Sequence, residues 1–107
     1  MEKLEKKLEN QELILKNGTG RECYTFARDV KGADVQKLGD RLIEVGTGYD
    51  CCTFALDFKG ADIQKLEARV LEIGDKYDCH MFSKYIKGAN VQNLKARAEE
   101  FKKAYIQ

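Results

Sequence analysis

The chain repeats itself with a period of 28 residues. Read from Cys23, the three copies are CYTFARDVKGADVQKLGDRLIEVGTGYD, CCTFALDFKGADIQKLEARVLEIGDKYD and CHMFSKYIKGANVQNLKARAEEFKKAYI. The first two copies are identical at 17 of 28 positions, and the second and third at 11 of 28. A fixed period in this range indicates stacked structural repeats. We therefore expect one domain over residues 1–107, made of a leading helix (1–18) and three repeats (19–46, 47–74 and 75–107).

Two structures compete for one repeat: a strand followed by a helix, as in leucine-rich repeats, or two short helices. The leucine-rich pattern L-x-x-L-x-L-x-x-N is absent from the chain. As a helix, the first half of a repeat groups apolar residues at spacings of three, one and three, namely Cys23, Phe26, Ala27 and Val30. A strand over the same residues would put Arg28 on the apolar face. The periodicity therefore favours two helices.

Signals for helix ends recur at the same period. Each first half follows a cap residue with an acid three positions later, which is the capping-box pattern: Thr19 and Glu22, Thr47 and Asp50, Asp75 and Asp78. Each first half then meets a Lys-Gly pair, whose glycine we expect to end the helix in the left-handed conformation: Gly32, Gly60 and Gly88. Two positions further on stand caps for a second helix: Asp34, Asp62 and Asn90.

The second half of each repeat carries an apolar stripe with helical spacing. In the first copy the stripe is Val35, Leu38, Leu42 and Val45. A glycine follows the first two stripes, whereas Lys102 replaces it in the third, so the last helix should continue to the C-terminus. Helices this short are unstable alone and must pack on their neighbours. The expected fold is all-α, a short α-solenoid of about seven helices, with one leading helix and three αα-hairpins.

The motif FARDVKGADVQKL at residues 26–38, echoed from Phe54 and Phe82, resembles the short tandem helical repeats of uncharacterised bacterial and phage proteins. It is similar in kind to HEAT, armadillo and tetratricopeptide arrays, although each repeat is shorter. The resemblance covers nearly the whole chain. It implies an α-solenoid that serves as a binding scaffold, and it transfers no catalytic residue.

Composition narrows the classes of function. The net charge is +1 and 35% of the residues are charged, which is unlike a strongly basic nucleic-acid binder. No stretch approaches the roughly 20 apolar residues of a membrane span, and the N-terminus has no signal-peptide core. Four cysteines without a secretion signal suggest free thiols in the reducing cytoplasm. We therefore expect a cytoplasmic protein that does not bind membranes.

No set of residues indicates catalysis. His80 is the only histidine and Ser83 the only serine, and no nucleophile stands at a recognisable spacing from His80. The Gly-Thr-Gly segments at 18–20 and 46–48 lack the lysine of a phosphate-binding loop, and helix caps explain them. We expect a protein that is not an enzyme and has no catalytic residue, no cofactor and no metal site.

Two rows of residues are expected to be internal. Cys23, Cys51 and Cys79 share one repeat position, and packed helices stand about 10 Å apart, which is too far for a disulfide or a shared zinc ion. They should form a ladder of core residues. Cys52 and His80 also share a position, but two ligands do not make a zinc site. The aromatic row of Tyr49, Tyr77 and Tyr105 is expected to pack between adjacent hairpins.

Charged residues recur along the second helices, which commonly line one broad face of an α-solenoid. Two interpretations stay open: a solvated face with Arg–Glu pairs, which duplication alone would produce, or a mixed-charge groove for a partner. The candidate partner-binding residues are Lys37, Arg41, Glu44, Lys65, Arg69, Glu72, Arg97 and Glu100.

These rows suggest a non-enzymatic module that binds a macromolecular partner, most simply a protein. The alternatives are a nucleic-acid-binding repeat protein, in which the cationic rows contact phosphates, and a small phage or mobile-element inhibitor of a host complex. The glutamates interleaved with the arginines disfavour nucleic acid. No feature of the sequence specifies an oligomeric state.

Overall fold

The computed structural model describes the backbone of residues 2–106 and the side chains of residues 5–104. Over these residues the chain forms seven helices and no strand. They are α1 (Glu2–Asn17), α2 (Gly20–Asp29), α3 (Val35–Val45), α4 (Gly48–Asp57), α5 (Ile63–Ile73), α6 (Lys76–Tyr85) and α7 (Val91–Ile106). The fold is all-α, as the capping and periodicity signals predict.

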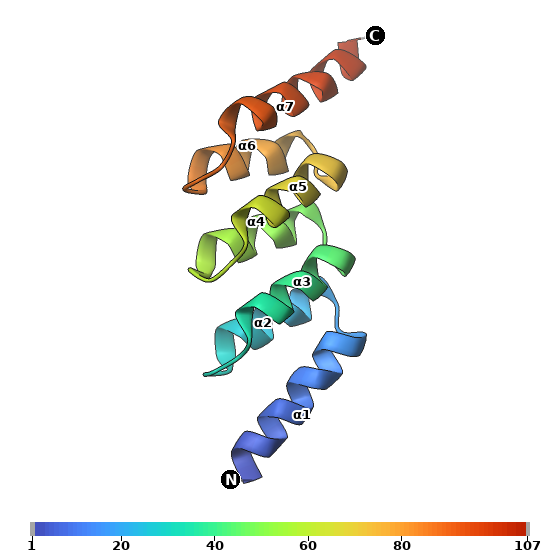
Figure 1. Cartoon of the computed structure of the whole chain (residues 1–107). Coiled ribbons are helices and arrows are strands. Elements are labelled where there is room, and N and C mark those ends of the chain that lie inside the picture. The colour runs from blue at the N-terminus through green and yellow to red at the C-terminus, as the bar shows by residue number, and fades with distance from the viewer. Residues whose placement is uncertain (1, 107) are drawn as a thin grey trace.

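The helices stack as three hairpins, α2–α3, α4–α5 and α6–α7, into a rod of 59 × 24 × 16 Å. Figure 1 shows the first helices of the hairpins (α2, α4, α6) in one layer and the second helices (α3, α5, α7) in the other. α1 precedes the stack and contacts both α2 and α3, so it takes the place of a second helix. Three seams therefore join consecutive second helices: α1–α3, α3–α5 (the middle seam) and α5–α7.

All three capping boxes form at the starts of α2, α4 and α6. In α2, the Glu22 N–H donates to Thr19 Oγ1 over 3.1 Å, and the Thr19 N–H donates to Glu22 Oε1 over 3.0 Å. The second helices α3 and α5 are capped by Asp34 and Asp62, and Asn90 accepts from the Asn93 N–H over 3.1 Å in α7. These starts are confirmed as the sequence predicts them.

The ends of the first helices differ from the expectation. They end at Asp29, Asp57 and Tyr85, and each is followed by an extended residue rather than by a left-handed glycine. The Lys-Gly pair lies in the next β-turn, where the Ala33 N–H donates to the Val30 carbonyl over 3.2 Å. Gly32 and Gly88 have φ of +85° and +92°, as the third residue of a type II turn requires. Gly60 has no positive φ, so its expected left-handed conformation is wrong.

Neighbouring hairpins approach each other closely at the helix junctions. A Cβ on Gly20 would lie 2.7 Å from Gly46 Cα, and one on Gly48 would lie 2.8 Å from Gly74 Cα. All four glycines are buried. The Gly-Thr-Gly segments therefore do more than cap helices, because they let the backbone of one repeat contact that of the next. The third copy has Lys76 at this position, and α7 continues through Lys102, the equivalent of Gly46 and Gly74.

The core runs along the axis between the two layers. The first helices contribute fully buried Phe54 and Phe82 and the second helices contribute Leu38, Leu42, Leu66, Val70 and Leu94. Phe26 is only half-buried, because among the described residues α2 has a first helix, α4, packed on one side only. The ends of the predicted stripes are exposed, with Val45 at 42% and Ile73 at 41%.

Candidate functional site

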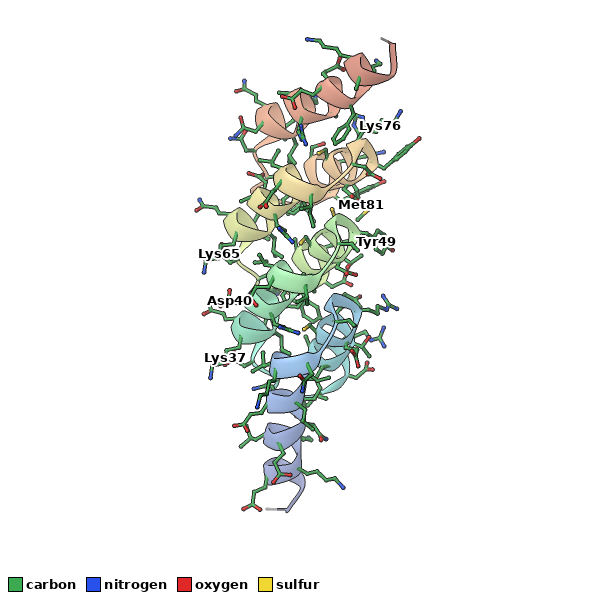
Figure 2. The ribbon with its side chains drawn as sticks, turned by 90° about the vertical axis from the view of Figure 1, so that its right-hand side faces the viewer. Lys37, Asp40, Tyr49, Lys65, Lys76 and Met81 are labelled. Carbon is green, nitrogen blue, oxygen red and sulfur yellow. The ribbon has the colours of Figure 1, made fainter. Side chains whose placement is uncertain are left out.

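The second-helix face carries the charged rows. Figure 2 shows Lys37, Asp40 and Lys65 along one side of the rod, with Tyr49 and Met81 along the opposite side. Lys37 is exposed, and the Lys65 ammonium lies 3.7 Å from Asp40 Oδ1 of the preceding second helix. The lysine row is therefore available at the surface, with one lysine already beside a carboxylate.

Each arginine of the predicted site pairs with the glutamate three residues later. The Arg–Glu distances are 3.9 Å for Arg41–Glu44, 3.2 Å for Arg69–Glu72 and 2.5 Å for Arg97–Glu100. The glutamate side chains are 63–72% exposed, whereas the arginine side chains are 23–35% exposed. Exposed pairs of this kind contribute only tenths of a kcal/mol.

Two of the arginines also hold consecutive second helices together. Arg41 Nε donates to the carbonyl of Gly18, just past α1, over 3.2 Å, and Arg97 Nε donates to the Leu71 carbonyl in α5 over 3.1 Å. A cation at the carbonyl end of a helix also complements the helix dipole. The sequence did not predict this structural contact, which makes the arginines poor probes of a free binding surface.

The middle seam lacks the equivalent contact. Arg69 Nε is buried with no acceptor among the described residues. Here a groove of about 430 Å³ opens between α3 and α5. Its charged lining residues are Asp40, Glu44, Lys65, Arg69 and Glu72, and its apolar ones are Ile43 and Ala68. Four of the eight predicted site residues line this groove; Lys37, Arg41, Arg97 and Glu100 do not.

A smaller, more enclosed notch of about 60 Å³ adjoins the groove, sharing Asp40, Ile43 and Lys65 with it. Gly39 lies at the notch, where its missing side chain leaves space beside Leu66 and the cap residue Asp62. A Cβ on Gly39 would lie 3.0 Å from Phe54 Cε1, so the ring of Phe54 closes the inner side. Groove and notch together form a concave region of the second-helix face at the middle seam.

The tyrosine row does not pack between hairpins. Tyr49 is 56% exposed and Tyr77 is 70% exposed, which contradicts the expectation of internal packing. Both follow the first residue of a first helix, so their side chains leave the rod at its surface. The side chain of Tyr105 lies outside the described residues.

The cysteine ladder is internal. Cys23, Cys51, Cys52 and Cys79 are free and have no exposed surface. Burial raises the pKa of Cys23 to about 11 and the pKa of Cys51 and Cys52 to about 12. Cys52 Sγ donates to the Asp78 carbonyl over 3.4 Å, whereas His80 is exposed. Cys52 is therefore a packed core residue that is shielded from solvent.

We predict that the native thiols react slowly with a thiol-specific reagent such as DTNB at mildly alkaline pH. Raising a thiol pKa from 9.0 to about 11 lowers its thiolate fraction, and the thiolate is the reactive form. The shift alone slows the reaction about 100-fold, and burial slows it further. All four thiols should react promptly in denaturing urea. A thiol that reacts in the folded protein as fast as in urea would contradict the buried ladder.

The sign of the linked stability change follows from the same shift. A thiol whose pKa is raised in the folded state contributes full stability below the unfolded pKa. For Cys23 this contribution is lost as the pH rises from 9.0 to about 11, because only the unfolded chain ionises in that range.

Other chemistry in the described part of the chain is sparse. Ser83 Oγ donates to the His80 carbonyl over 3.0 Å, a local bond within α6. Among the described residues, no three His, Cys, Asp or Glu side chains are grouped so that they could hold a metal ion. No described helix has the length and apolar character needed to cross a membrane.

Comparisons with known proteins add no assignment to this geometry. No protein-family model, curated protein or solved structure matches the chain. A functional proposal therefore rests on the second-helix face, and above all on the groove and notch of the middle seam.

Proposed function

We propose that this chain is a non-enzymatic interaction module that binds a protein partner through the face lined by α3, α5 and α7. The observation that carries the proposal is the groove of about 430 Å³ across the middle seam, which is lined by half of the predicted site residues. Its lining combines five charged residues with the apolar Ile43 and Ala68. Such a mixture suits a peptide segment that brings both apolar and charged side chains.

The charge pattern supports a protein partner over a nucleic acid. Each arginine of the row lies beside a glutamate, so a phosphate approaching the guanidinium would also meet a carboxylate. Binding to phosphates relies on unopposed cations, and its affinity falls steeply with salt. The proposed setting is a cytoplasmic scaffold of the α-solenoid type, formed by one domain of repeats.

The test uses the exposed lysines, because the arginines also stabilise the fold. We predict that the double variant Lys37→Glu/Lys65→Glu loses partner affinity by about tenfold, equivalent to about 1.4 kcal/mol, since it reverses one charge that lines the groove and one elsewhere on the same face. The measurement is quantitative affinity capture of the tagged chain from host-cell lysate, followed by titration of the captured partner by calorimetry.

Lys84→Glu is the matched control, because Lys84 lies on α6, a first helix, and is also exposed. It should leave partner affinity unchanged. Equal binding by the wild type and by the double variant would overturn the proposed face. Capture of nucleic acid in place of protein, with binding abolished by moderate salt, would favour the alternative function.

A further inference from the structure

The middle seam lacks a hydrogen bond that both other seams make. In the seam α1–α3, Gln11 Oε1 accepts from the main-chain N–H of the cap residue Asp34 over 2.7 Å. In the seam α5–α7, Glu67 Oε1 accepts from the N–H of the cap residue Asn90 over 2.5 Å. Gln11 and Glu67 stand 28 residues before and after Gly39. The acceptor position is therefore a regular feature of this fold, and glycine leaves it empty in the middle.

The corresponding donor is free among the described residues. The N–H of Asp62, the cap residue of α5, has no acceptor there, and Asp62 itself is exposed. The space that a side chain at position 39 would fill is the notch of about 60 Å³. A single water needs only about 10–15 Å³ of such volume, so the notch has room for a group of several atoms.

A Cβ at position 39 would lie 3.0 Å from Phe54 Cε1, a tight contact that a small shift of the ring would relieve. Phe26, Phe54 and Phe82 share one repeat position, and Phe26 and Phe82 coexist with Gln11 and Glu67 on the preceding second helices. Glycine inside a helix costs about 1 kcal/mol relative to alanine. The first repeat of the middle seam thus carries an unfavourable glycine at position 39. The missing side chain there leaves the main-chain N–H of Asp62 without the acceptor that the other two seams supply.

The charges around the notch select the kind of acceptor. Where the cap residue is the anionic Asp34, the acceptor is the neutral amide of Gln11; where the cap is the neutral Asn90, the acceptor is the carboxylate of Glu67. The middle seam has the anionic cap Asp62, and Asp40 also lines the notch. Lys65 is the one cation lining it and lies 3.7 Å from Asp40. A ligand carboxylate would be the third at the notch, beside Asp40 and Asp62 with only Lys65 to offset them, so a neutral acceptor fits.

We propose that the notch at Gly39 is a subsite for a carboxamide, the side chain of a glutamine or asparagine in the protein partner. Its carbonyl oxygen accepts from the Asp62 N–H, as Gln11 does for Asp34, and its NH₂ group donates to the carboxylate of Asp40 or Asp62. This inference rests on the proposed function, since the notch opens beside the groove that the partner would occupy.

The test is a titration of the isotope-labelled full chain, followed by amide NMR. The probe is an acetylated and amidated Gly-Gln-Gly tripeptide at millimolar concentrations, compared with Gly-Glu-Gly and Gly-Gly-Gly. We expect a saturable downfield shift of the Asp62 amide proton with the glutamine probe, and a markedly smaller one with the other two. The amides of Asp34 and Asn90 are internal controls, because their acceptors are already in place.

Two variants separate the notch from general effects. Gly39→Gln should place its own amide in the notch and abolish the shift, whereas Gly39→Ala adds the same Cβ beside Phe54 and should retain it. Three results would overturn the subsite: no shift of the Asp62 amide, an equal shift with Gly-Gly-Gly, or equal shifts at Asp34 and Asn90. If a protein partner binds the wild type and Gly39→Gln with equal affinity, the notch is not part of the interface. The proposed function would still stand in that case.

Discussion

Replacing Phe54 by alanine is expected to lower the free energy of unfolding by about 3–5 kcal/mol. Phe54 has no exposed surface and lies on α4, the central first helix. Its ring centroid is 4.6 Å from that of Phe58, and its Cε1 lies beside Gly39. Because glycine has no side chain that could move into the void, the site is poorly able to collapse. A domain of this size has about 5–15 kcal/mol of stability in total, so the loss is severe.

The repeat supplies a matched control for this prediction. Phe26→Ala removes the same side chain from the same repeat position, but Phe26 is half-buried at the open end of the stack. Its cost should be clearly smaller. Urea unfolding followed by far-UV circular dichroism gives both values. Equal losses for the two variants would mean that the middle of the rod is no more tightly packed than its end.

Much of the fold could be predicted because each helix of the three hairpins carries its own start signal. A capping box needs only two residues three positions apart, and Thr19 with Glu22 makes the predicted contacts without help from distant parts of the chain. Helical periodicity identified the fully buried residues Leu38 and Leu42 for the same local reason. The tandem repeat then tripled each signal, which is why the number and order of helices agree with the structure.

Features that depend on contacts between repeats could not be predicted in this way. Whether Arg41 points into solvent or reaches the Gly18 carbonyl depends on where α1 ends relative to α3. The exposure of Tyr77 depends on the angle at which a helix leaves its junction. The empty acceptor at Gly39 becomes visible only once Gln11 and Glu67 are seen to bond across their seams. In the sequence the eight candidate site residues are known only as residues that recur at the repeat period. The structure adds that four of them line the groove at the middle seam.

The junction glycines lead to a prediction whose sign is opposite to that of helix propensity. Gly48 is the first residue of α4, where alanine would ordinarily favour the helix and reduce the entropy of the unfolded chain. In this fold a Cβ there would lie 2.8 Å from Gly74 Cα and would contact the Asp78 carboxylate that caps α6. Backbone cannot yield as a flexible side chain can, so the second and third hairpins must move apart.

We therefore expect Gly48→Ala to lower the free energy of unfolding by about 1–3 kcal/mol, as overpacking of a close contact does. Lys76→Ala is the control, because it puts alanine at the same repeat position, where lysine already carries a Cβ. It adds no new contact with the backbone, so its cost should be clearly smaller than that of Gly48→Ala. Urea unfolding of both variants measures the difference. A stabilised Gly48→Ala variant would show that the close approach of Gly48 and Gly74 does not constrain the stack.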